Sequence, residues 1–221
     1  MTHRVTHYCR KLTLLLALLA ADWRSSFPVD KKDLGPTGRN PYFILELGYK
    51  LHFAHGKTRM VMSVLNETKT IDWVETRVIE DREEVDGKVC EVTRDYYAID
   101  RKTGDVYYFG EDVDVYRNGK LKGHGGSWLS GVKGAKFGLT MPAKPVAGDR
   151  FEQELAPKNK AVDRSEVISL NEKVSTPAGV FENCVHMKDS SRLEAAADHK
   201  FYAPGIGLVK DGELELVKIE K

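Results

Sequence analysis

Hydrophobic and polar residues alternate in short runs from about residue 41 to the C-terminus. A period of two is typical of β-strands that bury one face. Asp86-Gly87 and Asn118-Gly119 each separate two such runs, and these dipeptides favour tight hairpin turns. Only residues 190–199 suggest a short helix. The pattern predicts an all-β protein with a single antiparallel, strongly curved sheet that forms a barrel or half-barrel, with a sandwich as the alternative.

The N-terminus differs from the rest of the chain. Three basic residues precede an apolar run at 12–21, so residues 1–21 are predicted to be a signal peptide, with a short buried helix as the alternative. The run is too short to cross a bilayer, which takes about 20 residues. Residues 22–40 hold two prolines and two glycines and suggest a linker or an ordered arm. Residues 41–221 would form a single β domain of an exported protein, periplasmic or extracellular, without a transmembrane span.

The net charge bears on whether the protein binds nucleic acid, and the cysteines bear on whether it forms a disulfide. The chain has 34 basic and 33 acidic residues, a formal net charge of +1, which gives no electrostatic case for binding nucleic acid. Cys9 precedes the apolar run, is not placed for a lipid anchor, and would be lost with the signal peptide. Cys90 and Cys184 remain, either as a disulfide or as two buried free thiols.

The hairpin turns predict the register of three successive strands. A two-residue loop at Asp86-Gly87 and a four-residue loop at 101–104 set the pairing, and the second loop places Arg94 opposite Glu111. The two hairpins, assigned separately, gather their apolar residues on one face, and this agreement supports both turns. We expect that face to point inward; it carries Arg77, Arg94, Tyr96, Tyr107, Phe109, Glu111, Val113 and Val115.

Three acids stand close together in the run from 107 to 120. Alternation directs Glu111 inward and Asp112 and Asp114 to solvent. Two outward carboxylates supply too few oxygens for Ca²⁺, which takes about six to eight. A buried carboxylate is costly unless it is paired, so we expect Glu111 to pair with Arg94. That pair is either a structural ion pair or part of a ligand site.

The ligand-site hypothesis gathers seven residues inside the barrel. The polar groups would orient a ligand between aromatic side chains. Trp128 lies in the Gly-rich, irregular segment 119–148 and either covers the mouth of the cavity or plugs one end of the barrel. The predicted ligand-binding residues are Arg77, Arg94, Tyr96, Tyr107, Phe109, Glu111 and Trp128.

Catalytic and metal-binding signals are few. His52 and His55 are three apart, which on a strand puts them on opposite faces. Extending the Asn118-Gly119 hairpin places His124 opposite Val113, near Glu111. A metal or acid–base site of Glu111 and His124 is therefore the alternative to a turn histidine. No activated nucleophile or phosphate-binding loop is recognisable, so no catalytic residue and no cofactor is predicted, with a metal ion as the alternative.

Four stretches carry a resemblance: "TRVIEDREEVDGK", "YYFGEDVDVYRNGK", "GSWLSGVKGAKFGLTMPAKPVAGDRFEQELAP" and "KFYAPGIGLVKD". From about Tyr42 onward the chain resembles a group of exported, uncharacterised bacterial β-rich proteins, and its ending is similar to periplasmic domains with a curved LolA-like sheet. The resemblance implies an extracytoplasmic half-barrel with one concave face and brings no catalytic residues. Many such proteins carry a lipoprotein cysteine, which this chain lacks.

These observations predict a soluble, exported, monomeric binding protein rather than an enzyme. Its concave face would hold an apolar or amphipathic ligand, or dock a partner protein of the envelope. One alternative is an extracytoplasmic hydrolase or metalloenzyme that uses Glu111 and His124. Another is a structural protein of the envelope without a small ligand.

Overall fold

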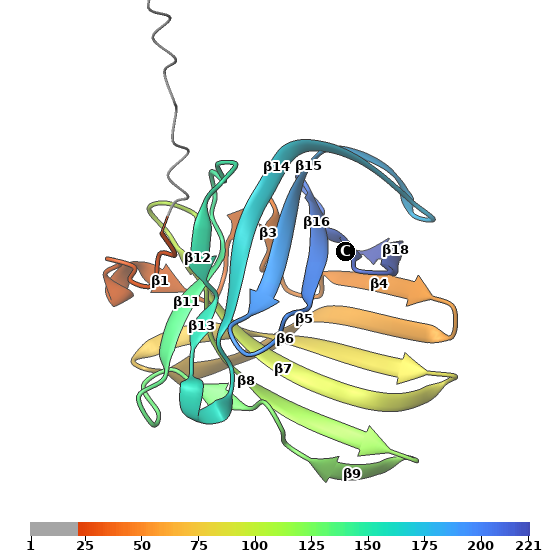
Figure 1. Cartoon of the computed structure of the whole chain (residues 1–221), viewed down its shortest axis with the longest axis horizontal. Coiled ribbons are helices and arrows are strands. Elements are labelled where there is room, and N and C mark those ends of the chain that lie inside the picture. Colours follow the sequence, from red (N-terminus) through yellow and green to blue (C-terminus); the bar gives the residue numbers. More distant parts are fainter. Residues whose placement is uncertain (1–21) are drawn as a thin grey trace, which may run out of the picture.

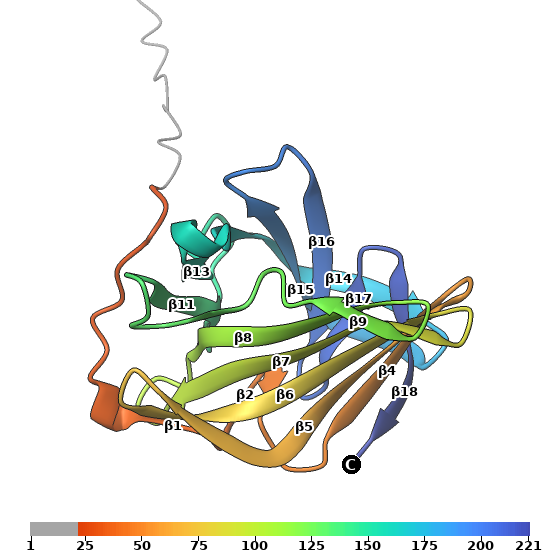
Figure 2. The same ribbon diagram turned by 90° about the horizontal axis from the view of Figure 1, so that it is seen from below.

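The structure, a computed structural model, describes residues 22–221 and is built almost wholly of antiparallel β-strands (Figures 1 and 2). One large sheet curls until it is nearly closed into a barrel, which confirms the predicted fold class. The predicted signal peptide, residues 1–21, lies outside the described residues. The short helix that the sequence allowed at 190–199 does not form: this stretch completes one strand, forms an irregular loop and begins the next strand.

The strand bounds show long central strands and short strands at the ends of the sheet. Two short 3-10 helices complete the described structure, η1 (Lys31–Asp33) and η2 (Pro157–Asn159). The strands are β1 (Leu34–Gly35), β2 (Arg39–Asn40), β3 (Phe43–Ile44), β4 (Lys50–His55), β5 (Thr58–Ile71), β6 (Val74–Val85), β7 (Lys88–Asp100), β8 (Val106–Arg117), β9 (Lys120–Gly123), β10 (Trp128–Leu129), β11 (Lys136–Met141), β12 (Arg150–Glu152), β13 (Glu154–Leu155), β14 (Asp163–Thr176), β15 (Gly179–Ser191), β16 (Ala197–Ala203), β17 (Gly207–Asp211) and β18 (Leu214–Glu220).

The barrel closes through one short segment of the chain. The main sheet runs β12-β14-β15-β16-β17-β18-β4-β5-β6-β7-β8-β11-β13, so β12 and β13 are its two ends. These strands are separated in sequence only by Gln153. The first half of the segment 150–155 pairs with β14 and the second half pairs with β11. We call this segment the seam.

Gly138 of β11 allows the seam to approach. A Cβ atom added at this position would lie 2.4 Å from the carbonyl oxygens of both Glu152 and Gln153. Any side chain here would push β11 away from the segment that closes the barrel. The fit at the seam therefore depends on a residue without a side chain.

Residues 22–40 lie along the barrel. The backbone of Arg24 exchanges hydrogen bonds with that of the seam, donating to the carbonyl of Arg150 over 2.9 Å and accepting from the amide of Glu152 over 3.0 Å. Phe27 packs edge-on against Tyr107, with ring centroids 5.8 Å apart. Strand β1 pairs with β7, and Leu34 is buried. This part of the chain is an arm held to the barrel at several points.

The predicted hairpin turns form as expected. Asp86, Gly87, Asn118 and Gly119 all have φ between 54° and 71°, the conformation that a two-residue turn of this kind requires. Val85 then pairs with Lys88, and Arg117 pairs with Lys120. The loop at 101–104 is also confirmed, because Ile99 pairs with Val106.

β-bulges change the register beyond each turn. The pairing shifts by one residue between Glu83 and Glu84, and again between Tyr96 and Tyr97, where Phe109 is the extra residue on β8. Beyond each bulge, every residue pairs with a partner one position away from the one predicted. Because side chains alternate between the two faces of a sheet, residues predicted to share a face then lie on opposite faces. The predicted pairing of Arg94 with Glu111 is therefore wrong. Arg94 lies opposite Asp112, and Glu111 lies opposite Asp95.

Candidate functional site: a two-part cavity in the barrel

The barrel holds two adjoining cavities of different chemical character. The first, of about 100 Å³, is lined mostly by hydrophobic and aromatic residues, among them Phe43, Leu51, Met60, Ile79, Tyr202 and Leu208, and also by Asp189, Lys200 and Asp211. The second, of about 240 Å³, is almost entirely polar. We call them the apolar compartment and the acidic compartment. Both are lined by Asp81, Tyr97, Gln153 and Lys200, so the two compartments adjoin at these residues.

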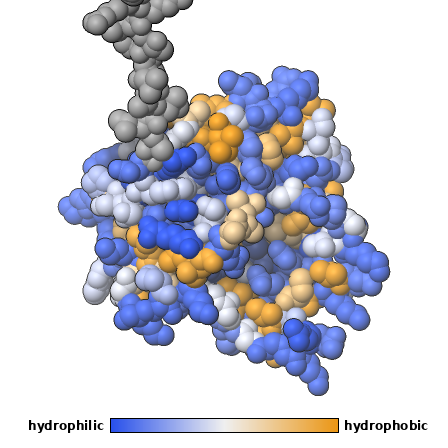
Figure 3. Space-filling model, viewed as in Figure 1, coloured by the Kyte–Doolittle hydropathy of each residue, from blue (hydrophilic) through white to orange (hydrophobic). Residues whose placement is uncertain are grey.

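The site lies inside the curved sheet and reaches the surface. Figure 3 shows a hollow on the face that looks toward the viewer in Figure 1, with hydrophobic and hydrophilic residues around it. Alternation along the central strands brings the acids to this interior. Asp81 and Glu83 share one face of β6, and Thr93, Asp95 and Tyr97 share one face of β7.

The acidic compartment concentrates carboxyl groups. Seven acidic side chains and a single lysine line it, from strands on both sides of the barrel. Asp163 stands at the start of β14, and its amide donates a hydrogen bond to Oε1 of Glu154 over 3.1 Å. The acids are Asp81, Glu83, Glu91, Asp95, Glu111, Glu154 and Asp163.

Burial and mutual repulsion favour the neutral form of several of these acids. Burial, with the charges of Asp95 and Glu154, raises the pKa of Glu111 to about 9. Burial, together with Asp163, raises the pKa of Glu154 to about 8. Burial and Asp95 raise the pKa of Asp81 well above its ordinary value. At neutral pH the cavity therefore holds protonated carboxyl groups as well as carboxylates.

Lys200 does not neutralise the compartment. Its Nζ lies 3.3 Å from Oδ2 of Asp189 and 3.7 Å from Oδ2 of Asp211, two acids outside the set of seven. Burial alone would lower the pKa of Lys200, but these two carboxylates raise it well above the ordinary value. The charge of Lys200 is thus matched by its own neighbours, and the compartment remains acidic.

Two polar atoms that border the cavity have no hydrogen-bond partner among the described residues. One is Oδ1 of Asp81, where the two compartments meet. The other is Oγ1 of Thr140, a residue that is 8% exposed and lines the apolar compartment. Buried polar groups in proteins nearly always have a partner. These two oxygens are therefore free to accept a hydrogen bond from any donor that reaches them.

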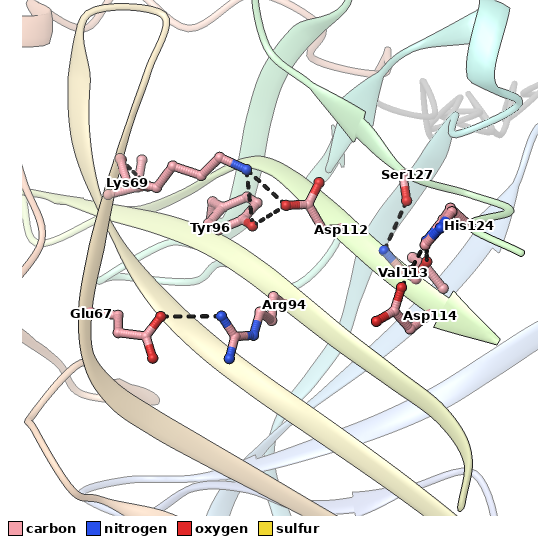
Figure 4. Close-up of polar contacts among 10 residues, drawn as sticks. Glu67, Lys69, Arg94, Tyr96, Asp112, Val113, Asp114, His124 and Ser127 are labelled. Carbon is pink, nitrogen blue, oxygen red and sulfur yellow. Dashed lines mark hydrogen bonds and ion pairs between the residues drawn. The ribbon is translucent and has the colours of Figure 1, made fainter. Parts of the chain in front are cut away.

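Arg94 and Tyr96, predicted to face the ligand, lie on the face of β7 opposite the cavity, where Tyr96 is buried and Arg94 is exposed (Figure 4). Arg94 forms ion pairs with Glu67 over 3.1 Å and with Glu80 over 3.2 Å. The hydroxyl of Tyr96 donates to Asp112 over 2.5 Å, and Lys69 approaches the same carboxylate to 2.7 Å. Asp112 is exposed, as predicted. The bulge at Phe109 explains the difference. It shifts the pairing by one residue, so Arg94 and Tyr96 lie on the face of the sheet opposite to that of Glu111.

Tyr107 and Phe109 also do not line the cavity. Their rings pack against Phe137, with centroids 5.8 Å and 4.7 Å away. Their neighbour Tyr108 takes the predicted role, because it lines the acidic compartment and stacks on Tyr97 with ring centroids 4.9 Å apart. Of the predicted ligand-binding residues, Glu111 alone lines the cavity.

Arg77 and Trp128 are buried parts of the framework. Arg77 donates hydrogen bonds to the backbone carbonyls of Pro36, Leu65 and Glu67 and to the hydroxyl of Thr37. Trp128 packs edge-on against Tyr108, with centroids 5.3 Å apart, and lies behind the wall of the acidic compartment. This position resembles the predicted plug more than a cover over the cavity mouth.

His124 does not join Glu111. A register shift between Val115 and Tyr116 brings it beside Asp114, with 2.7 Å between Nδ1 and Oδ1 (Figure 4). His124 is largely exposed, whereas Glu111 lines the cavity. Over residues 22–221, no three His, Cys, Asp or Glu side chains are arranged to hold a metal ion. Cys90 and Cys184 are free thiols rather than a disulfide.

Sequence reasoning missed most of the residues that form the site. Asp81 and Glu83 alternate along β6, and Glu91 and Asp95 recur on β7, so a shared acidic face was visible in the sequence. Such a pattern ordinarily marks a solvated face. The acids from β13 to β17 join it only through long-range pairing, for which the sequence carries no short-range signal.

Comparisons with known proteins identify no family. No family model matches the chain, and no curated protein sequence matches it. Among solved structures it is similar to one described as a "putative lipoprotein" from Parabacteroides distasonis ATCC 8503, with 12% sequence identity and a TM-score of 0.38 over 83% of this chain and 100% of that one. Within residues 22–221, no helix is long and apolar enough to cross a membrane. The LolA-like resemblance stays a prediction.

Proposed function

We propose that the protein is a binding protein that holds a small amphipathic molecule inside its barrel. The apolar part of the ligand would lie among the side chains of the apolar compartment, and its polar part would reach the acidic compartment. The observation that carries the proposal is that two chemically different compartments adjoin at Asp81 and Tyr97. A site with one apolar end and one polar end matches a molecule with the same division.

Size and unsatisfied polar groups support the same proposal. Ligand pockets in proteins usually measure roughly 300–1,000 Å³, and each compartment alone is smaller. A ligand of ordinary size would therefore occupy both. Such a ligand would pass Asp81 and lie close to Thr140, where it would provide hydrogen bonds that the protein does not.

We also propose that the protein is exported and works in the periplasm or outside the cell as a soluble monomer. The support is the pattern of residues 1–21, with its basic start and apolar core. Catalysis by Glu111 and His124 is not proposed, because His124 pairs with Asp114 on the outer face.

The proposal can be tested with a neutral, polarity-sensitive fluorescent probe. The probe should bind the purified protein, and Val64→Phe, which fills space in the apolar compartment, should weaken its binding by roughly tenfold. Val180→Phe makes the same change at an exposed site on β15 and should leave binding unchanged. If Val64→Phe unfolds the protein, Met62→Phe fills the same compartment from a partly buried position. Equal binding to wild type and to a folded cavity-filling variant would contradict the proposal.

A further inference from the structure

We propose that the ligand is an amphipathic amine whose ammonium group is held at Asp81, with its apolar tail in the apolar compartment. This inference rests on the proposed function and deepens it by naming the chemical class of the polar end. It comes from three independent observations: the charge of the acidic compartment, the missing hydrogen bonds at its boundary, and the aromatic wall beside them.

The charge distribution favours a cation. Seven carboxyl groups line the acidic compartment, and Lys200 is the one cationic side chain in its lining. Because Asp189 and Asp211 pair with Lys200, its ammonium is not available to hold an anionic ligand. A carboxylate or phosphate entering the compartment would be repelled by the acids that stay ionised at neutral pH, such as Asp95, whereas an ammonium group would be attracted to them and would favour ionisation of the others.

The missing hydrogen bonds favour a donor. Oδ1 of Asp81 is buried, lacks a partner and lies where the compartments meet. A carboxylate oxygen accepts hydrogen bonds, and an ammonium group donates up to three and accepts none. Thr140 places a second unpartnered oxygen in the lining of the apolar compartment. An ammonium group beside Asp81 would supply the missing donor, and its charge would favour the ionised form of Asp81.

Aromatic rings complete the boundary. Tyr97 lines both compartments, and its ring lies between those of Phe43 and Tyr108, with centroid separations of 4.9 Å to each. Aromatic rings attract cations and also pack against alkyl chains. The carbon next to an amine nitrogen is part of an alkyl chain and also carries part of the positive charge. The aromatic rings therefore suit the point where the ammonium group joins the apolar tail.

An organic cation fits the site better than a metal ion. Among the described residues, no three potential metal ligands converge on one point, although many acids are near. A metal ion would need several oxygens at coordination distance at once. An alkylammonium group needs only one or two acceptors and gains the rest of its binding free energy from burial of the tail.

A matched ligand series tests the inference by displacement of the neutral probe. Hexylamine should displace the probe at a concentration at least roughly tenfold lower than 1-hexanol or hexanoate. Asp81→Asn should weaken hexylamine by roughly tenfold and leave 1-hexanol nearly unchanged, because only the charged contact is lost. Asp112→Asn removes the same charge on the outer face of β8 and should change neither ligand. If Asp81→Asn fails to fold, Glu154→Gln removes another cavity acid.

The possible outcomes separate this inference from the proposed function. Probe binding with displacement by hexanoate or 1-hexanol as strong as by hexylamine would overturn the amine and leave the binding function intact. Displacement of hexylamine by millimolar CaCl₂ but not by NaCl of equal ionic strength would also overturn it, in favour of a metal site. Failure of the probe to bind would overturn the proposed function itself.

Discussion

The hydroxyl of Tyr108 donates a hydrogen bond to Oδ1 of Asp95 over 2.5 Å, and both side chains are buried. Glu111 lies directly across from Asp95 on the neighbouring strand. Burial raises the pKa of Asp95, but the bond from Tyr108 and the charge of Lys200 limit the rise to about 6. Burial also raises the pKa of Glu111, and the charges of Asp95 and Glu154 raise it further, to about 9. At neutral pH Asp95 therefore carries the negative charge of the pair, and Glu111 carries the proton.

Removing that hydroxyl should destabilise the protein and raise the pKa of Asp95 above 6. Tyr108→Phe leaves the carboxylate without its donor, and the free energy of unfolding should fall by about 1–3 kcal/mol. Urea unfolding at neutral pH and an NMR titration of the Asp95 carboxyl carbon measure the two effects. Tyr107→Phe is the control, since the hydroxyl of Tyr107 bonds no described residue, and it should change stability by about 0.5 kcal/mol or less. Equal effects of the two variants would contradict the assignment.

Glu111 should make the protein less stable as the pH rises. The folded protein holds the proton of Glu111 up to a pKa of about 9, whereas the unfolded chain loses it near 4.5. Raising the pH through this window therefore favours unfolding. Glu111→Gln cannot ionise, so it should match wild type near pH 4 and exceed it near pH 9 by on the order of 1–3 kcal/mol. Parallel stability curves for the two proteins across this range would count against a buried, protonated Glu111.

Binding of an amine should release protons. The ionisable groups around the cavity, besides tyrosines whose pKa is raised by burial, are Asp81, Glu83, Glu91, Asp95, Glu111, Glu154, Asp163, Asp189, Lys200 and Asp211. An ammonium group lowers the pKa of nearby carboxyl groups, so Asp81, Glu111 and Glu154 should lose protons when it binds at neutral pH. The affinity for hexylamine should then rise by roughly tenfold or more from pH 6 to pH 9.

Calorimetry in two buffers of different ionisation enthalpy would count the released protons. Glu111→Gln should reduce that number, while Asp112→Asn on the outer face should not. An affinity that is independent of pH, with no proton release, would show that the ammonium does not reach these acids.

Closure of the barrel should require glycine at position 138 of β11, because the seam leaves no room for a side chain there. Gly138→Ala places a methyl group 2.4 Å from two seam carbonyl oxygens and should lower the free energy of unfolding by about 2–4 kcal/mol. Gly123→Ala, on β9, meets no atom within 4 Å and is the control. Thermal unfolding monitored by circular dichroism compares the two. A stable Gly138→Ala variant would mean that β11 and the seam are farther apart.

The two arginines that sequence reasoning placed at the ligand should instead differ in their effect on folding. Arg77→Ala leaves three backbone carbonyls without their donor, and we expect a loss of about 2–4 kcal/mol. Arg94→Ala breaks exposed ion pairs and should cost about 1 kcal/mol or less. Arg94→Ala should bind the fluorescent probe as wild type does. Reduced probe binding by folded Arg94→Ala would return that residue to the site.

Local sequence signals predicted the local structure well. Asp86-Gly87 and Asn118-Gly119 form the expected turns, because few other residues adopt positive φ at two successive positions. The inward direction of Glu111 is also confirmed. The error lies in its partner. A bulge adds one residue to a strand without a clear sequence signal. The glycine at position 110, within a strand, was one hint, and in the structure its φ is 137°.

The acidic compartment could not be predicted from the sequence for a different reason. Asp95 and Glu154 lie on β7 and β13, and their side chains meet only because the sheet curls round. Alternation indicates which residues share a face of one strand, but not which distant strands will face each other across a barrel. In the sequence alone, alternating acids on β6 and β7 that line a cavity look the same as acids that face solvent.

The seam has a consequence for how copies of this protein meet one another. An open sheet presents unpaired amide and carbonyl groups along its outermost strands, and such edges recruit strands from other molecules. Here the two outermost strands, β12 and β13, are three and two residues long and continue into one another through Gln153. Curling the sheet onto this segment leaves little edge at either end for a second chain to extend, which opposes aggregation by strand addition there.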